Sequence, residues 1–285
     1  MKRTILVWSV SFVLTLAFLV WQKVSGPTYE VKFRENVAGA PVRGELLRTH
    51  SINGDMPVTV HAPDPGVTAV VEWRRYPTQD PWEHLPMQRD GEVLRAQLPR
   101  QKMAGKLEYY VHIHKDAAVV KVPADEAAVA RYKGDVPALI LVFHVSFMII
   151  GMFFSTSCGL TGLLGGSAAL RPLSMLSFLF LLLGGCILGP IVQKYAFDAY
   201  WTGWPLGSDW TDNKLAVGAL AWLAAAWRCR GAREGRPVGR WWAFVAMLAI
   251  IVIYSIPHSI HGSTLDYETG EHIQALVAPL RSPAG

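Results

Sequence analysis

The sequence is poor in cysteine and in charge. Three cysteines occur among 285 residues, and all of them, Cys158, Cys186 and Cys229, lie in or beside apolar runs. Their number and placement provide neither a disulfide framework nor a zinc-binding spacing. Charged residues make up 17% of the chain, against roughly 25% in soluble domains. The deficit is confined to apolar runs, so part of the chain is expected in a membrane. The net charge of +5 is therefore interpreted by location and does not indicate nucleic-acid binding.

Common catalytic signatures are absent as well. The sequence contains no His-Glu-x-x-His, no Gly-x-Ser-x-Gly, no Walker loop and no dinucleotide fingerprint. Gly165-Gly166-Ser167 resembles a nucleophile context only superficially, because no histidine is expected on that side of the membrane to activate the serine. The sequence therefore favours a protein that is not an enzyme, without excluding one.

The chain begins with a basic N-terminus and an apolar segment. Thr4 to Trp21 is long enough to span a bilayer as a helix. Lys2 and Arg3 precede it, which places the N-terminus in the cytoplasm and exports the region after the helix. No small-x-small cleavage site precedes Gln22. This favours an uncleaved transmembrane anchor over residues 1–27, the alternative being a cleaved signal peptide.

Residues 28–135 have the pattern of an all-β domain outside the membrane. Apolar and polar residues alternate from Leu107 to His114, and runs at 57–62, 67–76, 82–88 and 92–98 predict further strands. Asp90-Gly91 is a favoured pair for a tight hairpin turn. About seven strands in this length predict an immunoglobulin-like sandwich. The Trp73 strand, the Trp82 to Met87 hairpin, Leu98-Pro99 and the Leu107-Glu-Tyr-Tyr-Val strand resemble fibronectin type III and related immunoglobulin-like modules. That resemblance implies a partner-binding or spacer role.

Residues 136–258 are expected to form a membrane domain of four helices. The apolar segments are 138–157, 173–193, 214–227 and 241–257, and residues 259–285 form a tail after them. Residues 228–240 contain five arginines and a single acid, Glu234. This excess of positive charge places the connection in the cytoplasm. The predicted fold is therefore a multidomain membrane protein with a signal anchor, an all-β immunoglobulin-like sandwich and a C-terminal four-helix transmembrane bundle. It is expected in a bacterial inner membrane, with the sandwich and the C-terminus in the periplasm.

The stretch from Gly184 to Lys214 changes abruptly from apolar to polar and is the strongest candidate site. Gly185-x-x-x-Gly189 predicts close helix packing. The polar part is expected to be one connected cluster at the outer end of the bundle, with Lys194 paired to acids, His258 joined to it and His144 beneath. It forms either a partner-binding face or an ordinary aromatic belt. Its residues are Gln193, Lys194, Asp198, Trp201, Trp204, Asp209, Asp212, Asn213 and Lys214.

Three histidines suggest a second hypothesis. An ionisable residue in a membrane segment usually faces the bundle interior, so His144 is either functional or a neutral histidine bonded to a neighbouring helix. His258 and His261, with acids after them, have side chains suited to a transition metal. His144 and His258 together suggest a bis-histidine haem. The alternative for the tail is a solvated or loop-anchoring segment.

Several motifs in the second half of the chain resemble an uncharacterised group of bacterial integral membrane proteins. They are Gly134-Asp-Val-Pro137, Gly189-Pro-Ile-Val-Gln-Lys-Tyr-Ala-Phe, Trp201-Thr-Gly-Trp-Pro, Thr211-Asp-Asn-Lys214 and Ile256-Pro-His-Ser. The resemblance covers residues 130–268 and implies a recurring membrane unit without an assigned reaction. Cys158 stands where a basic residue is expected.

The leading interpretation is a non-enzymatic inner-membrane protein with a periplasmic face for a protein partner. It would be an accessory or assembly subunit of an electron-transfer or photosynthetic membrane complex. The alternative is a redox, metal-binding or haem-binding membrane protein that uses His144, His258 and His261. Membrane lipid and other membrane or periplasmic subunits are the expected partners.

Overall fold

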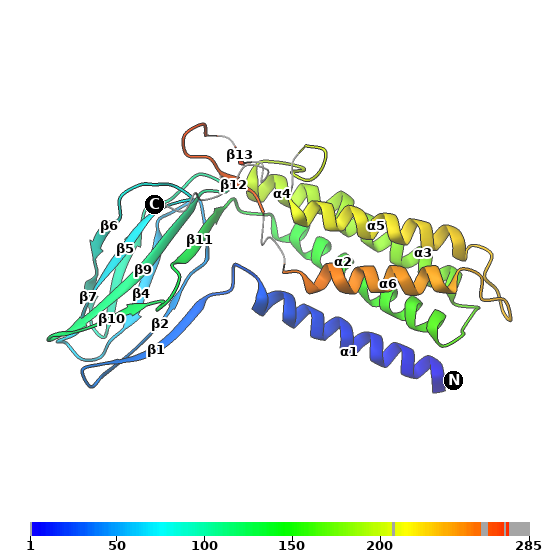
Figure 1. The fold of residues 1–285 in the computed structure, drawn as a ribbon, viewed down its shortest axis with the longest axis horizontal. Helices are drawn as coiled ribbons and strands as arrows, with labels where there is room; N and C mark the ends of the chain where they lie inside the picture. The colour runs from blue at the N-terminus through cyan, green and yellow to red at the C-terminus, as the bar shows by residue number, and fades with distance from the viewer. Residues whose placement is uncertain (1, 207–208, 258–261, 271, 274–285) are drawn as a thin grey trace, which may run out of the picture. The chain divides into compact units, whose positions relative to one another are not determined.

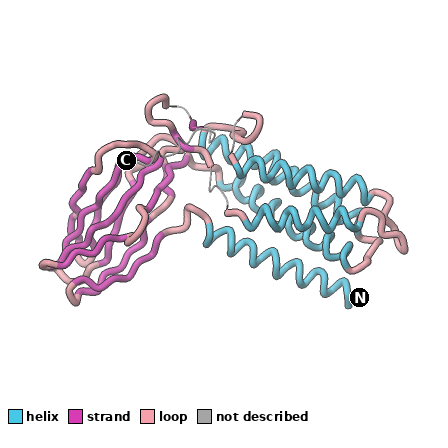
Figure 2. Tube along the Cα trace, viewed as in Figure 1, coloured by secondary structure: helices cyan, strands magenta, loops and turns pink. Residues whose placement is uncertain are grey.

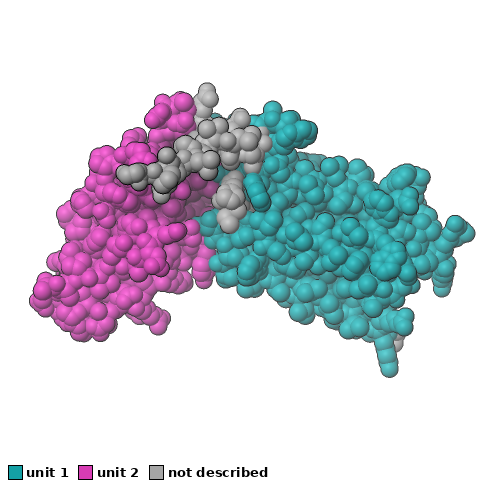
Figure 3. Space-filling view, in the orientation of Figure 1, with its two compact units in different colours: residues 1–27, 136–262, 274–285 teal, residues 28–135, 263–273 magenta. Residues whose placement is uncertain are grey.

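The computed structural model describes residues 2–206, 209–257, 262–270 and 272–273. The chain divides into two compact units (Figure 3). The first contains residues 1–27 and 136–262, and the second contains residues 28–135 and 263–273. Helices make up the first unit and strands the second (Figure 2).

The first unit consists of helices that pack against one another (Figure 1). Helix α1 contacts α2 and α6, α2 contacts α3, and α5 contacts both α3 and α6. Among the described residues, α1, α2 and the continuous stretch 170–197 are long and apolar enough to cross a membrane, and α6 is a shorter apolar helix. The bounds are α1 Lys2–Ser25, α2 Ala138–Leu163, α3 Leu170–Leu181, the π-helix η1 Leu182–Leu188, α4 Gly189–Phe197, α5 Trp210–Cys229 and α6 Arg240–Ser255.

This helical unit is apolar outside and partly polar inside. Leu139, Val217 and Val252 are each more than half exposed. Hydroxyl groups lie inside, where Thr156 and Ser177 donate to the carbonyl four residues earlier at 2.9 and 2.7 Å. Apolar side chains that face outward, with small and polar ones between the helices, are typical of helices packed in lipid. The chain is therefore a membrane protein in this part.

Helix α2 is longer than expected, because it continues to Leu163 rather than ending near residue 157. The two glycines in the added turns lie where α6 comes close. A Cβ on Gly162 would lie 2.7 Å from the backbone oxygen of Arg240, and one on Gly159 would collide with Met247. These glycines therefore allow close packing of two helices and do not mark a turn.

The segment expected over 173–193 extends over 170–197 and contains the π-helix. Pro190 lies at the start of α4. A proline has no N–H and its ring meets the carbonyl four residues earlier, so an uninterrupted α-helix is disfavoured here. Gly189 instead donates to the carbonyls of both Gly184 and Gly185. The widened turn accommodates the proline without ending the helix.

Gly185 and Gly189, expected to pack against the backbone of another helix, instead pack against the side chain of Leu215 in α5. A Cβ on Gly185 would collide with Leu215 of α5, and one on Gly189 would lie 3.7 Å from the same leucine. The close approach to a neighbouring backbone occurs one residue earlier, at Gly184, where a Cβ would lie 3.1 Å from the nitrogen of Met148 in α2. The glycines thus form a notch for Leu215.

The second unit confirms the expected sandwich of two sheets. One sheet has the strand order β1-β2-β4-β8-β7, and the other has β3-β11-β9-β5-β6 with β10 also paired to β9. Pairing is antiparallel except between β11 and β3. The strands are β1 Val31–Val37, β2 Ala40–Leu46, β3 Thr49–Ser51, β4 Met56–His61, β5 Thr68–Tyr76, β6 Glu83–Pro86, β7 Gln88–Asp90, β8 Val93–Leu98, β9 Lys106–Lys115, β10 Ala118–Val122 and β11 Ala128–Lys133.

The run 82–88, expected to be one strand, is divided between the two sheets. Strand β6 pairs with β5, whereas β7 pairs with β8. Between them Met87 is buried, and its N–H donates to Ala69 at 2.9 Å. The expected hairpin is present, but Asp90 pairs with Val93, so its loop is Gly91-Glu92. Gly91 has a positive φ of 59°, which glycine adopts readily.

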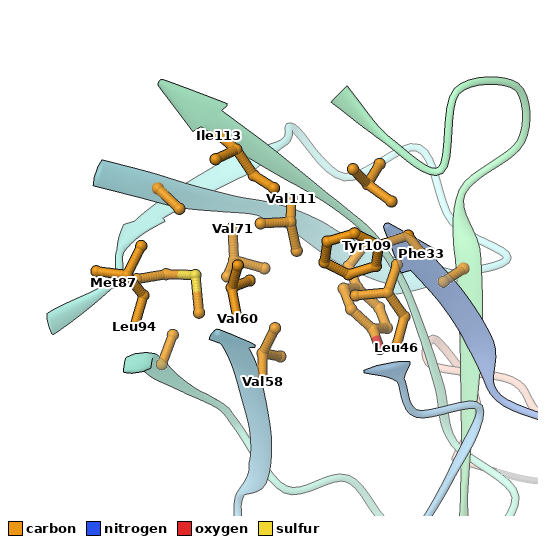
Figure 4. Packing of buried hydrophobic residues seen from close by; sticks show 14 of the residues in the cluster. Phe33, Leu46, Val58, Val60, Val71, Met87, Leu94, Tyr109, Val111 and Ile113 are labelled. Carbon is orange, nitrogen blue, oxygen red and sulfur yellow. The ribbon is translucent and has the colours of Figure 1, made fainter. Parts of the chain in front are cut away.

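The core of the sandwich lies between the two sheets (Figure 4). Val58 and Val60 of β4 face Val71 of β5 and Val111 of β9. Tyr109 is fully buried, and its hydroxyl donates to the carbonyl of Leu47 at 2.8 Å. The alternation in the sequence therefore separates core from surface without any disulfide.

Residues 263–273 join the sandwich unit, although they come after the last helix. Strand β12 (Thr264–Leu265) pairs with β13 (His272–Ile273), and Leu265 donates to the carbonyl of Ala104 at 3.0 Å. The Tyr267 hydroxyl accepts from the Lys106 N–H at 2.9 Å and donates to the Lys106 carbonyl at 2.8 Å. Burial raises the pKa of Tyr267 to about 12, so the hydroxyl keeps its proton.

An ion pair beside Tyr267 leads to a prediction about pH. Arg75 lies over the Tyr267 ring and donates from two nitrogens to Asp80. The hydrogen bond from Arg75 lowers the pKa of Asp80, so the pair stabilises the fold above the unfolded value of about 3.9. This contribution is lost as the pH falls through the folded pKa. Because the pair is partly exposed, we expect no more than about 1 kcal/mol.

The measurement compares melting of the whole chain with that of the Asp80→Asn variant between pH 3 and 7. The variant should melt lower near pH 7, and the difference should shrink only as the pH falls below about 3.9, toward the lowered folded pKa of Asp80. Asp116→Asn, a change to an exposed turn residue, is the control. A difference that grows on acidification would contradict the assignment.

Candidate functional site

The predicted polar segment forms a loop between α4 and α5, of which the structure describes residues 198–206 and 209. Helix α4 ends at Asp198, which takes the left-handed conformation with φ 62°. Helix α5 begins after Asp209, whose carboxylate accepts from the Thr211 N–H at 2.7 Å. An aspartate at this position satisfies an amide that the helix leaves open. The carboxylate at the start of α5 is thus fixed by the helix itself.

Two buried carboxylates meet at one hydroxyl, that of Thr202. Asp209 and Asp212 are 7% and 6% exposed. The Thr202 hydroxyl lies 3.2 Å from Asp209 Oδ2 and 3.3 Å from Asp212 Oδ2, and it accepts from Gln193 Nε2 at 2.6 Å. A hydroxyl has one proton to donate. It therefore serves one carboxylate at a time and holds both near Gln193.

Asp212 also fixes the backbone of the loop. Its Oδ2 accepts from the Thr202 N–H at 2.7 Å and from Gln193 Nε2 at 3.2 Å. Asn213 accepts from the Trp204 N–H at 2.7 Å through its side-chain oxygen. A Cβ on Gly203, between these two amides, would lie 2.7 Å from the Cβ of Asp212. The loop is thus held against the first turn of α5.

The side chains of this loop are largely apolar and exposed. Trp204 is 77% exposed, and Tyr200, Leu206 and Trp210 are each more than half exposed. The indole N–H of Trp201 donates to the carbonyl of Trp204 at 3.1 Å. The result is a fixed backbone on buried polar groups, with an apolar surface above it. We call the side chains of Tyr200, Trp204, Leu206 and Trp210 the aromatic face.

Of the acids expected to compensate Lys194, only Asp198 pairs with it among the described ion pairs. The ammonium lies 2.6 Å from the Asp198 carboxylate, one turn later on the same segment, and 5.5 Å from the centre of the Tyr200 ring. Both side chains of the pair are exposed. Lys214 Nζ instead donates to the carbonyls of Ile256 and Pro257, at 3.2 and 3.4 Å. Lys214 thus binds the two carbonyls that directly follow the last residue of α6.

The structure places His144 on α2, partly buried, with Nδ1 2.8 Å from the carbonyl oxygen of Gly184. This bond matches the role of a neutral histidine tied to a neighbouring helix. Gly184 precedes Gln193 by about 13 Å of helix, and no described hydrogen bond links His144 to the Thr202 cluster. His258 and His261 lie outside the described residues. Their haem and metal roles, and the place of His258 in the cluster, therefore stay predictions.

Within the described residues, no group of three histidine, cysteine, aspartate or glutamate side chains is placed to hold a metal ion. The residue that sequence reasoning missed is Thr202, which connects Gln193 with both acids. A small hydroxyl residue before Gly203, among tryptophans, was the available signal. Its partners lie about ten residues away along the chain, and that pairing is visible only in the folded loop.

Comparison with protein-family models, curated proteins and solved structures finds no significant match to this chain. The class of protein is therefore defined by the fold of this chain and not by a relative. The chain is a membrane protein with apolar helices and a two-sheet β domain that is compatible with an immunoglobulin-like module.

Proposed function

We propose that the chain is a non-enzymatic inner-membrane protein that presents a periplasmic face to a protein partner. The observation that carries this proposal is the aromatic face, whose backbone is fixed by Asp212 and Asn213 while Trp204 stays 77% exposed. Exposed aromatic side chains are enriched in the anchors of protein interfaces. A backbone ordered before binding also reduces the entropy lost on association.

Two features support the orientation. Basic residues at the start of α1 and between α5 and α6 favour the cytoplasm for both positions. Residues 28–135 and 263–273 fold as one unit, so the chain between them must cross the membrane an even number of times. Crossings by α2, by 170–197, by α6 and by α5 satisfy this condition; α5 is not among the helices that are long and apolar enough by themselves, but it packs against α3 and α6. The sandwich, the aromatic face and the C-terminus then share the periplasmic side.

We further propose that α1 stays attached as part of the helical unit. Its buried face carries Ser11 and Thr15, and its last turns bond to the end of α6. Trp21 Nε1 donates to the Ser255 carbonyl at 3.0 Å, and Gln22 Nε2 donates to the Ile256 carbonyl at 3.1 Å. Cleavage and loss of α1 would remove donors for α6 carbonyls, which supports an anchor over a cleaved signal peptide.

The proposed partner is an electron-transfer or photosynthetic membrane complex, in which the chain is an accessory or assembly subunit. The competing explanation of the aromatic face is a belt that lies in the lipid headgroup region, since tryptophan and tyrosine are enriched there in any membrane protein. If the aromatic face binds a partner, Trp204 contacts a protein. If it is a belt in the headgroup region, Trp204 contacts lipid.

Site-specific photo-crosslinking in cells distinguishes them. A photoreactive phenylalanine at position 204 should give a discrete protein adduct that contains a subunit of such a complex. The matched control is position 220, a leucine on α5 that is 64% exposed and expected to face lipid. Equal adduct patterns at the two positions, or no protein adduct at 204, would refute the partner face.

A further inference from the structure

The connection between α5 and α6 carries an unusual excess of positive charge. We define the arginine loop as residues 228–240, which contain Arg228, Arg230, Arg233, Arg236 and Arg240 and the single acid Glu234. The structure describes the whole of this loop. None of its arginines takes part in the ion pairs found in the described part of the chain. Their charge is therefore not neutralised by the described part of the protein.

The tip of the arginine loop brings two of these charges together. Arg233 and Arg236 exchange both backbone hydrogen bonds, at 3.2 and 2.8 Å, around Glu234 and Gly235. Residues directly opposite in an antiparallel pair project their side chains from the same face, and like charges so placed repel each other. Both side chains are exposed. An anion bound between the two guanidinium groups would remove the repulsion.

Opposed arginines alone do not define a site, because Arg34 and Arg43 are also directly opposite in β1 and β2. What distinguishes the arginine loop is its tryptophans at the helix ends. Arg230 lies 4.8 Å from the ring centre of Trp227, Arg240 lies 4.8 Å from that of Trp241, and Arg228 lies 5.5 Å from that of Trp242.

These three rings are about half exposed, at 55%, 54% and 48% for Trp227, Trp241 and Trp242. Exposed tryptophan at the end of a membrane helix sits at the level of the lipid headgroups. A guanidinium group stacked on a ring keeps the N–H donors in its plane available for phosphate. The loop therefore holds phosphate-binding groups at the depth where lipid phosphates lie.

We propose that the arginine loop binds the headgroup of an anionic phospholipid. Arg228, Arg230 and Arg240, stacked on the rings, contact the phosphate with the forked geometry that guanidinium and phosphate share. The opposed Arg233 and Arg236 add positive charge on the same loop. The tryptophan rings contact the glycerol and the upper acyl chain. The net charge of the loop selects anionic over zwitterionic lipid. This site is independent of the proposed partner face, and either one can fail without the other.

The test uses the full chain, purified in a neutral detergent. Binding of dioctanoyl phosphatidylglycerol, dioctanoyl phosphatidylcholine and sodium phosphate is measured by calorimetry at one ionic strength. Phosphatidylglycerol should bind, and the other two should bind far more weakly. The variant Arg233→Gln/Arg236→Gln should bind phosphatidylglycerol roughly 30-fold more weakly, as expected for two basic groups near a lipid surface. Arg34→Gln/Arg43→Gln, the same change on the β sandwich, should bind like the unaltered chain.

Three results would overturn the proposal. The first is equal binding of phosphatidylglycerol and phosphatidylcholine by the unaltered chain, a comparison that does not depend on how any variant folds. The second is binding of sodium phosphate as tight as that of the lipid, which would indicate a simple anion site. The third is a loss of affinity in the Arg34/Arg43 control as large as that in the Arg233/Arg236 variant.

Discussion

Replacing Asp212 with alanine is expected to destabilise the protein by about 1–4 kcal/mol, because two partly buried donors lose their acceptor. Asp212 is 6% exposed and accepts from the Thr202 N–H and from Gln193 Nε2. A fully buried donor left without its acceptor costs about 1–3 kcal/mol, and these two donors are partly buried, so each should cost less than the upper end of that range. Unfolding of the detergent-solubilised protein, followed by tryptophan fluorescence, measures the loss. The α4–α5 loop should also become accessible to protease in the variant.

The control for this prediction is Asp198→Asn, which removes the charge of the exposed pair with Lys194 and keeps a residue that tolerates the left-handed conformation at this position. Exposed ion pairs contribute little to stability, so this variant should melt like the unaltered protein. Asp212→Asn keeps one side-chain oxygen as an acceptor and should fall between the two. If Asp198→Asn is as destabilising as Asp212→Ala, the hydrogen bonds to Thr202 and Gln193 are not what holds the loop.

A second large loss is expected for Gly162→Ala in α2. Alanine normally favours a helix over glycine by up to about 1 kcal/mol. Here the new Cβ would lie 2.7 Å from the backbone oxygen of Arg240, so α2 and α6 must move apart. Overpacking of this kind costs about 1–3 kcal/mol. Unfolding in mixed detergent micelles should show the protein destabilised despite the better helix former.

Two other glycines calibrate this effect. At Gly159 the new Cβ would collide with the Cβ of Met247, an atom that no side-chain rotation moves, so Gly159→Ala should cost at least as much as Gly162→Ala. At Gly231 the nearest atom would be Val238 Cγ1 at 3.8 Å, an ordinary contact, and Gly231→Ala should be nearly neutral. Equal stability of the Gly162 and Gly231 variants would mean that α2 and α6 are not packed so closely.

The sandwich was predictable because its signal is local. Alternation from Leu107 to His114 predicted β9, which spans Lys106–Lys115, and similar runs predicted β4, β5 and β8. The division of residues 82–88 between two sheets was not predictable, since it depends on which strands β6 and β7 meet. The parallel pair of β11 and β3 and the addition of residues 263–273 likewise depend on contacts between distant parts of the chain.

The candidate site was predicted in location but only partly in its contacts. The change from apolar to polar after Gly189 located the loop, and the tryptophans indicated its surface. From charge alone, Asp198, Asp209 and Asp212 were all possible partners of Lys194. The acid that it contacts, Asp198, is the nearest of the three along the chain. The buried acids are instead satisfied by Thr202 and Gln193. Neutral donors do not appear in a count of charges, so nothing in the sequence pattern indicated them.

The most direct test of the central claim is the side of the membrane on which the aromatic face lies. Cysteine is introduced singly at Lys102, Trp204 and Glu234, and intact spheroplasts are treated with a membrane-impermeant maleimide. The native thiols of Cys158 and Cys229 are buried, and the unaltered protein gives the background. Positions 102 and 204 should react in intact spheroplasts, and position 234 only after lysis. Reaction of 204 and 234 from the same side, or protection of 204 until lysis, would contradict a periplasmic partner face.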